Sequence, residues 1–314
     1  MTPEPPARPA PPNGAGPSRS GDRTSTPGSA HRHRLRGLVR LGRNGGAIRI
    51  DEQRGPALLG DPSPLLQVNG VTKVFGGINA VSQVTFTVDR GESVGLVGPN
   101  GAGKTTLFNC VCGQLRADGG TVEFDGNELI GMSPHLRARL GIGRTFQRIE
   151  VFPEMTVRDH MLVADRAHRR DGRLWKDLLN MSKPTSEEMA RVEAVMSLVG
   201  IEAMADTMVA ALGLGSCRLV ELARALVGEP KLLMADEPSS GLDIHETHEL
   251  ATVLRTLQTE HGMAVLLVEH DLGMVGEVVD QVVVMDLGQV IARGTFDEVM
   301  ADPEVRHAYL GVAG

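Results

Sequence analysis

The segment around residues 93–106 constrains the fold of this chain more than any other. An apolar run, Ser93–Val97, leads directly into the sequence GPNGAGKT at 98–105, and a stretch of helical spacing follows at 105–113. A strand, a glycine-rich loop and a helix in this order are the context in which G-x-x-x-x-G-K-[ST] cradles phosphate. Glycines let successive backbone N–H groups point inward, and the start of the helix adds its dipole. The sequence therefore predicts nucleotide binding on an α/β sheet.

Two side chains of this loop are expected to take part in the chemistry. Lys104 would reach the β- and γ-phosphates, and the Thr105 hydroxyl would coordinate Mg²⁺. The alternative is a chance glycine-rich turn, which this composition produces on the order of once in a hundred such chains. The full predicted nucleotide-contacting loop is Gly98, Pro99, Asn100, Gly101, Ala102, Gly103, Lys104, Thr105 and Thr106.

A second candidate element is an apolar strand at 231–235 that ends in Asp236 and Glu237. Ligands gather at the carboxyl ends of strands in a parallel sheet, so this acidic pair can lie beside the phosphates. Asp236 is expected to hold Mg²⁺ through water, and Glu237 to polarise an attacking water. That arrangement favours hydrolysis over transfer to a bound acceptor. In isolation, the pair could also be a strand end with two solvated acids.

Charge divides the chain into two parts. Residues 1–64 hold ten Arg, five acidic residues and no Lys, a net charge of +5, so residues 65–314 carry −12 of the total of −7. The first part also has eleven of the 18 Pro and no aromatic residue, a composition that cannot bury enough apolar surface to order itself. We predict a disordered tail over 1–64 and a folded domain over 65–314. The acidic total argues against nucleic acid as a partner.

Apolar runs and cysteines exclude further classes of protein. No apolar run reaches the roughly 18 to 20 residues that cross a bilayer, so the chain is not expected to span one. The three cysteines Cys110, Cys112 and Cys217 are odd in number and lack C-x-x-C spacing. They are typical of buried apolar positions in a reducing compartment and not of disulfides or zinc ligands.

Taken together, the motifs resemble the nucleotide-binding subunit of an ATP-binding cassette (ABC) transporter. The resemblance covers residues 65–314 and implies a P-loop NTPase cassette with an antiparallel β subdomain and a helical subdomain at about 148–211. It implies ATP and Mg²⁺ as cofactors. The motifs in that family's order are GPNGAGKTT at 98–106, RTFQ at 144–147, LGLGS at 212–216, LLMADE at 232–237, SSGLD at 239–243 and EHD at 269–271.

The resemblance assigns roles residue by residue. Phe75 would stack on adenine, although the sequence alone leaves a core position equally open. Gln147 would touch Mg²⁺ and the attacking water in the loop that senses the membrane partner, and His270 would contact the γ-phosphate. Asp243 and Gly215 would act across a dimer. The expected catalytic set is Glu237, His270 and Gln147, and the expected Mg²⁺ ligands are Thr105, Gln147 and Asp236.

The signature motif departs from the family pattern. Where the family has Leu-Ser-Gly-Gly-Gln, this chain has LGLGS at 212–216, so the serine that meets the γ-phosphate and the final glutamine are missing. Gly215 is retained, and a helix is predicted over 217–227, whose first N–H groups could still bind the phosphate of a partner's ATP. A homodimer and a heterodimer with a second ATP-binding subunit both remain open. Between the halves of the cassette, helices are predicted at 150–161, 174–181 and 187–198.

The residues of several motifs indicate a branch of the family. Phe75-Gly76-Gly77, VEHD at 268–271 and DPEV at 302–305 resemble the ATPases of branched-chain amino-acid importers. The resemblance implies a peripheral subunit at the cytoplasmic face of the plasma membrane, working with integral-membrane permeases and a periplasmic or extracellular solute-binding protein. The alternatives are an importer of urea or amides, a lipopolysaccharide exporter, or a weakly hydrolysing nucleotide-dependent regulator.

Overall fold

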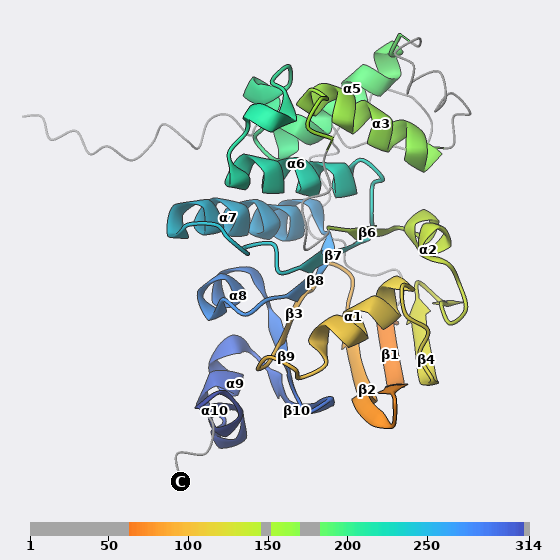
Figure 1. The fold of residues 1–314 in the computed structure, drawn as a ribbon, viewed down its shortest axis with the longest axis vertical. Helices are drawn as coiled ribbons and strands as arrows, with labels where there is room; N and C mark the ends of the chain where they lie inside the picture. Colours follow the sequence, from red (N-terminus) through yellow and green to blue (C-terminus); the bar gives the residue numbers. More distant parts are fainter. Residues whose placement is uncertain (1–62, 146–151, 170–182, 311–314) are drawn as a thin grey trace, which may run out of the picture. The chain divides into compact units, whose positions relative to one another are not determined.

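Six strands form the central sheet of the structure, which is a computed structural model that describes residues 63–145, 152–169 and 183–310 (Figure 1). The strand order is β10-β9-β3-β8-β7-β6, and every neighbouring pair is parallel except β10 and β9. The strands are β3 (Ser93–Val97), β6 (Ile142–Arg144), β7 (Leu232–Asp236), β8 (Ala264–Val268), β9 (Gln281–Asp286) and β10 (Gln289–Gly294). β3, β7 and β8 are buried along their whole length, as expected for parallel strands covered on both faces.

Alternate residues of the central strands enter two separate cores. In β7, Leu233 and Ala235 pack on the side of α6, α7 and α8, whereas Leu232 and Met234 pack on the side of α1 and the second sheet. This alternation is the period-two geometry of a strand. The helices are α1 (Lys104–Cys112), α6 (Leu214–Leu226), α7 (Ile244–His261) and α8 (Leu272–Val278), and the smaller α2 (Pro134–Leu140) precedes β6.

A second sheet of four strands covers the α1 side, in the order β2-β1-β4-β5 with every pair antiparallel. Its strands are β1 (Leu66–Phe75), β2 (Ile78–Val88), β4 (Gly119–Phe124) and β5 (Asn127–Glu128). Buried and exposed positions alternate over the first part of β1, so one face joins the core and the other meets solvent. The predicted antiparallel β subdomain and the α/β cassette fold are thus confirmed.

Helices gather at the far end of the cassette, beyond α7 (Figure 1). They are α3 (Val157–Arg169), α5 (Ser186–Leu198) and α6, with short 3₁₀ turns at Glu202–Met204 and Val209–Ala211. The helix predicted over 150–161 is wrong in its start, because Thr156 begins the helix by accepting a hydrogen bond from the N–H of Asp159. The helix predicted over 187–198 is confirmed as α5, and the one over 174–181 lies outside the described residues.

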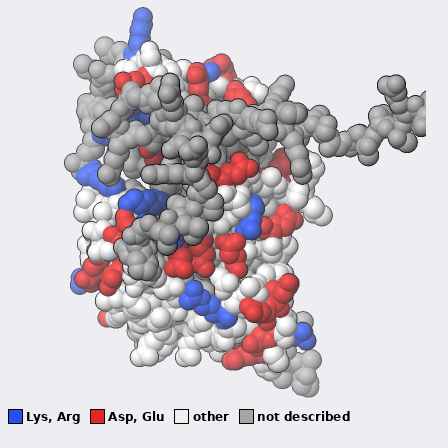
Figure 2. All heavy atoms as spheres, turned by 180° about the vertical axis from the view of Figure 1, so that it is seen from behind, with Lys and Arg blue, Asp and Glu red and all other residues white. Residues whose placement is uncertain are grey.

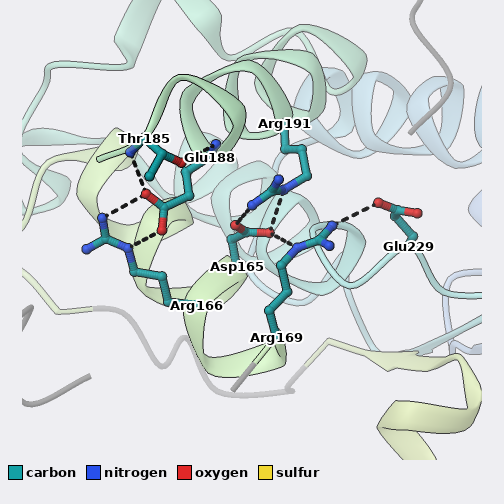
Figure 3. Close-up of polar contacts among 7 residues, drawn as sticks. All are labelled: Asp165, Arg166, Arg169, Thr185, Glu188, Arg191 and Glu229. Atoms are coloured by element: carbon teal, nitrogen blue, oxygen red, sulfur yellow. Dashed lines mark hydrogen bonds and ion pairs between the residues drawn. The ribbon is translucent and has the colours of Figure 1, made fainter. Parts of the chain in front are cut away.

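Two helices of this group are joined by a buried ion pair (Figure 3). The Glu188 carboxylate of α5 accepts hydrogen bonds from Nε and Nη2 of Arg166 of α3, at 2.8 and 3.0 Å. Both side chains are under 5% exposed. Glu188 also accepts the Thr185 N–H, which completes a capping box at the start of α5. Removing one partner of such a pair leaves a buried charge alone, at a cost of about 3–5 kcal/mol.

The same helices share a second carboxylate, Asp165, which is 1% exposed in its side chain. It accepts hydrogen bonds from Arg169 at 2.9 Å and from Arg191 of α5 at 2.6 Å. Arg169 reaches on to Glu229, in the loop between α6 and β7, at 3.2 Å (Figure 3). This ion-pair cluster therefore ties α3 and α5 to the segment that leads into the central sheet.

The end of the described chain packs beside the β9–β10 edge of the central sheet. It comprises α9 (Phe296–Ala301) and α10 (Pro303–Leu310), and α9 starts with a capping box between Thr295 and Glu298. Acidic and basic side chains are interspersed on the face in Figure 2, with acidic groups prominent among them. Across the described ranges, no helix has both the length and the apolar character needed to cross a membrane.

Candidate nucleotide-binding and hydrolysis site

The phosphate-binding loop between β3 and α1 has a conformation that only glycine allows at two positions. Gly98 has φ +146° and Gly103 has φ +96°, values that side-chain-bearing residues rarely adopt. A Cβ on Gly98 would lie 2.0 Å from the Met285 carbonyl oxygen, and one on Gly103 would lie 2.2 Å from that of Ala80. The loop backbone therefore passes close to both sheets, and the pattern predicted from the sequence has a steric basis here.

Lys104 is the first residue of α1 and is only 7% exposed. Its ammonium donates hydrogen bonds to the carbonyl oxygens of Gly98, at 2.7 Å, and Pro99, at 3.0 Å. Burial holds the pKa of Lys104 below its ordinary value, and the carboxylates of Glu237 and Asp236 act in the opposite direction. The ammonium is thus held over the loop, within electrostatic reach of the acidic pair.

Asp236 ends β7 and is 2% exposed. Its burial raises its pKa to about 6, with Glu237 and Glu269 contributing in the same direction and Arg144 opposing. The Oδ1 atom is buried and accepts no hydrogen bond from the residues that the structure describes. An orphaned carboxylate oxygen of this kind needs a cation or water, so Asp236 fits the predicted contact with hydrated Mg²⁺.

Glu237 follows with φ +47°, a left-handed conformation that is uncommon for a residue with a side chain. Its N–H donates to the Val268 carbonyl oxygen of β8 at 2.8 Å, which fixes the backbone in this conformation. Left-handed non-glycine residues cost of order 1–3 kcal/mol and cluster at functional sites. The left-handed backbone of Glu237 therefore changes the direction in which its side chain leaves the chain, directly after the buried strand.

Strand order brings these segments to one edge of the sheet. β8 lies between β3 and β7 and is parallel to both, so the loops after all three strands leave from the same carboxyl edge (Figure 1). The phosphate-binding loop follows β3, Asp236 ends β7 and Glu237 follows it, and His270 comes shortly after β8. The structure therefore brings the predicted loop, the acidic pair and the histidine to one edge.

His270 lies at this edge with its side chain 59% exposed. The next residue, Asp271, caps α8 by accepting the N–H groups of Gly273 and Met274. The residue before it, Glu269, is completely buried and accepts the N–H groups of His270 and Ser239. Sequence reasoning gave Glu269 no role, although a carboxylate directly after five apolar residues was a signal that it is held by specific partners.

The signature segment begins a helix three residues before the predicted start. α6 starts at Leu214, with Gly213 as an N-cap that has no side-chain oxygen to offer. The Gly215 N–H donates to Glu246 Oε1 of α7 at 3.2 Å. Asp243, predicted to act across a dimer, caps α7 in a capping box with the same Glu246. Glu246 is a second residue that the sequence analysis missed.

Phe75 ends β1 and is 46% exposed, so the core position left open by the sequence is wrong. The ammonium of Lys73 lies 5.3 Å from the centre of its ring. An exposed aromatic ring is available for stacking on a base. Thr105 is also exposed, in the first turn of α1, whereas Gln147 lies outside the described residues.

Comparisons with known proteins define the class. The family profile described as "ABC transporter" matches residues 81–240. A nucleotide-free ATP-binding cassette from an ABC transporter superimposes with a TM-score of 0.70 at 29% identity, over 79% of this chain and 100% of that one. The ADP conformation of a cassette gives 0.71 at 30% identity, over 79% and 99%. The chain belongs to the ABC transporter family, and it is an ATP-binding cassette ATPase.

Further matches indicate the branch of the family to which the chain belongs. The profile described as "Branched-chain amino acid ATP-binding cassette transporter" matches residues 289–314. The high-affinity branched-chain amino acid transport ATP-binding protein BraF of Pseudomonas aeruginosa is 38% identical over 80% of this chain and 99% of its own length. LivG of Salmonella typhimurium, of the same description, is 39% identical over 80% and 99%. This chain is an ATP-binding protein of the branched-chain amino acid transporter family, and the predicted family is confirmed.

Proposed function

We propose that this ATPase powers the import of branched-chain amino acids, or a similar small polar solute, through separate membrane permease subunits. The identity of 38–39% to BraF and LivG, over nearly their whole length, supports this solute class. The match of residues 289–314 to a profile of the same transporters supports it independently of the nucleotide site. The protein would act as a peripheral subunit on the cytoplasmic side, served by a solute-binding protein on the other side.

The observation that carries the hydrolytic role is the acidic pair at the carboxyl edge beside the phosphate-binding loop. Lys104 would hold the β- and γ-phosphates, and Phe75 would stack on the base. Glu237 would polarise the attacking water, since its backbone is locked after β7. His270 and Gln147 would complete the contacts around the γ-phosphate.

Mg²⁺ would be held by Thr105 and Asp236, with Gln147 as a further contact. The described residues contain no group of three or more His, Cys, Asp and Glu side chains that could hold a metal without help. This suits Mg²⁺, which proteins bind through one or two side chains together with substrate phosphates and water. When bound, the ion neutralises the charge that develops on the phosphates.

Two cassettes would close around two ATP molecules, each completed by Gly215 and Asp243 of the partner. The exposed apolar side chains Leu214, 40% exposed, and Ile244, 92% exposed, stand at the starts of α6 and α7 and support contact between copies there. A homodimer and a heterodimer with a second ATP-binding subunit both fit this arrangement.

The proposal is tested by affinity capture of this chain from gently solubilised native membranes, followed by mass spectrometry and by ATPase assay of the captured complex. Recovery of multi-span permeases, with hydrolysis stimulated by branched-chain amino acids and their binding protein, is the expected result. Stimulation by urea, amides or lipopolysaccharide instead would show that the transported solute belongs to that class and not to the branched-chain amino acids. Hydrolysis that no membrane partner stimulates would favour a nucleotide-dependent regulator. The altered signature motif at 212–216 is the feature that suggests this alternative.

A further inference from the structure

Glu269, the first residue after β8, is a fully buried carboxylate to which the site described above gives no chemical task. A buried charge is costly unless hydrogen bonds replace its hydration. The partners that satisfy Glu269 therefore show what its position depends on.

Its two oxygens divide between two loops. Oε1 accepts the backbone N–H of Ser239 at 2.9 Å, and Oε2 accepts those of His270, at 3.0 Å, and Asp271, at 3.3 Å. The Nδ1 atom of His270 lies 3.7 Å from the same Oε2. All three N–H donors belong to the backbone, so the carboxylate fixes the course of the chain and not merely the direction of a side chain.

The two loops that meet at Glu269 carry Glu237 and His270, two of the three residues predicted to be catalytic. Ser239 is two residues after Glu237, and His270 directly follows Glu269. One further bond joins the two segments just before these loops, from the Glu237 N–H to the carbonyl oxygen of Val268, the last residue of β8. Glu269 therefore extends the pairing of β7 with β8 by one step beyond the end of the sheet, where the ladder of strand hydrogen bonds has stopped.

The anchored segment is also connected to the signature helix. Arg218 of α6 donates to the carbonyl oxygen of Ser240 at 3.2 Å, next to the residue that Glu269 holds. In contrast, the phosphate-binding loop follows β3, and its hydrogen bonds go to other partners: the Gly98 and Pro99 carbonyl oxygens accept from Lys104, and the Ala102 carbonyl oxygen accepts the Gly288 N–H. A disturbance at Glu269 thus reaches the loops of Glu237 and His270 and spares the phosphate-binding loop.

We propose that Glu269 is a positioning residue, which sets the separation of Glu237 and His270 by binding the backbone of both loops through one carboxylate. The proposal rests on the roles proposed above for those two residues. A displacement of about 1 Å at a reacting group can cost on the order of 100-fold in rate. The consequence is specific: turnover depends on Glu269, whereas ATP affinity does not.

The test compares Glu269→Gln with Asp165→Asn in the full chain. Asp165 is equally buried and also accepts hydrogen bonds from three N–H groups, but these belong to Arg169 and Arg191 of the ion-pair cluster, away from the nucleotide edge. Gln keeps the volume of Glu269, yet its amide NH₂ faces N–H donors and cannot accept from them. We expect kcat to fall at least about 10-fold with the KM for ATP and the affinity for a non-hydrolysable analogue within 2-fold, while Asp165→Asn keeps its kcat per folded molecule.

Amide hydrogen exchange provides a readout that does not depend on activity. In Glu269→Gln, exchange at Ser239, His270 and Asp271 should accelerate, with little change in the phosphate-binding loop. Glu269→Asp, which keeps the charge on a shorter stem, should restore part of kcat. Equal loss of kcat in the Asp165→Asn control, or a parallel loss of ATP affinity, would overturn the proposal in favour of a purely structural role. A wild-type chain without ATPase activity would instead contradict the function proposed above, and the exchange result would still decide whether Glu269 holds both loops.

Discussion

The Gly215 N–H at the start of α6 donates to Oε1 of Glu246, the third residue of α7, at 3.2 Å. The other oxygen, Oε2, accepts the Asp243 N–H at 3.2 Å. One carboxylate thus caps two helices. The start of α6 is the place where the proposed dimer would receive the phosphate of a partner's ATP, so within a single chain a negative charge already occupies it.

Replacing Glu246 with Gln should therefore strengthen ATP-driven association. Gln serves at the third position of a capping box as Glu does, so the variant removes the charge and keeps the cap of α7. A charge at a helix end is worth about 0.3–1 kcal/mol, which corresponds to roughly 2- to 5-fold in dimer affinity. Sedimentation of the purified chain at saturating ATP, in a Glu237→Gln background, measures the dissociation constant.

A matched control is available in the same chain. Glu298 holds the same capping-box position in α9, near the C-terminal end of the described chain. Glu298→Gln should leave the dimer constant unchanged. Weaker association in Glu246→Gln than in this control would contradict the prediction and make the carboxylate a positive contributor to the dimer.

Lys104→Ala should lose ATP binding. Its ammonium already sits over the loop on the Gly98 and Pro99 carbonyl oxygens, so little rearrangement is needed to meet phosphate. A hydrogen bond to a charged group is worth about 1.5–3 kcal/mol, which predicts at least about a 10-fold loss of affinity in isothermal titration with ATP. Lys231→Ala removes an exposed ammonium that pairs with Asp125 and should bind ATP normally. Retained binding in Lys104→Ala would exclude the phosphate contact.

Glu237→Gln should bind ATP and hydrolyse it about 10²- to 10⁴-fold more slowly, because a neutral amide cannot take the proton of the attacking water. The left-handed backbone at this position is compatible with both side chains, so the fold should be retained. Steady-state phosphate release and equilibrium ATP binding, measured on the same preparation, separate the two effects. Normal turnover would sink the assignment of Glu237 as general base.

Acid stability should depend on Glu188. The Arg166 guanidinium and the Thr185 N–H lower the pKa of this carboxyl from its ordinary value to about 2. A carboxyl with a depressed folded pKa stabilises the fold above its unfolded pKa of about 4.5, and this stabilisation is lost as the pH falls from there towards 2.

Glu188→Gln should therefore lower the free energy of unfolding by about 3–5 kcal/mol at pH 7, since Arg166 remains buried without its counter-charge. The difference from wild type should shrink as the pH approaches 2 to 3, in urea titrations followed by circular dichroism. Comparison with wild type at each pH removes the contribution of Asp236, whose raised pKa of about 6 acts in the opposite direction. A difference independent of pH would mean that packing, and not charge, is lost.

Local patterns accounted for much of the fold. Ser93–Val97 and the loop after it were predictable because a buried parallel strand is a short apolar run and the loop needs its glycines. The helix over 187–198 followed from its period and its acidic first turn. The short strand Ile142–Arg144 was not foreseen, because three residues carry no period and it forms by pairing with Leu232–Asp236. The start at Val157 depended on Thr156 as a cap, whereas apolar spacing alone placed it earlier.

For the site, the sequence by itself determined which residues are predicted to bind phosphate, which carboxylates follow a buried strand, and to which family the order of the motifs belongs. Only the tertiary structure decided what Glu269 and Glu246 do, since each accepts N–H groups from segments about 30 residues away. Such contacts arise from the strand order, in which β8 lies between β3 and β7, and from the packing of α7 against α6. A local pattern records the burial that a residue needs, but the partner that satisfies a buried charge is chosen by which distant segments the fold brings together.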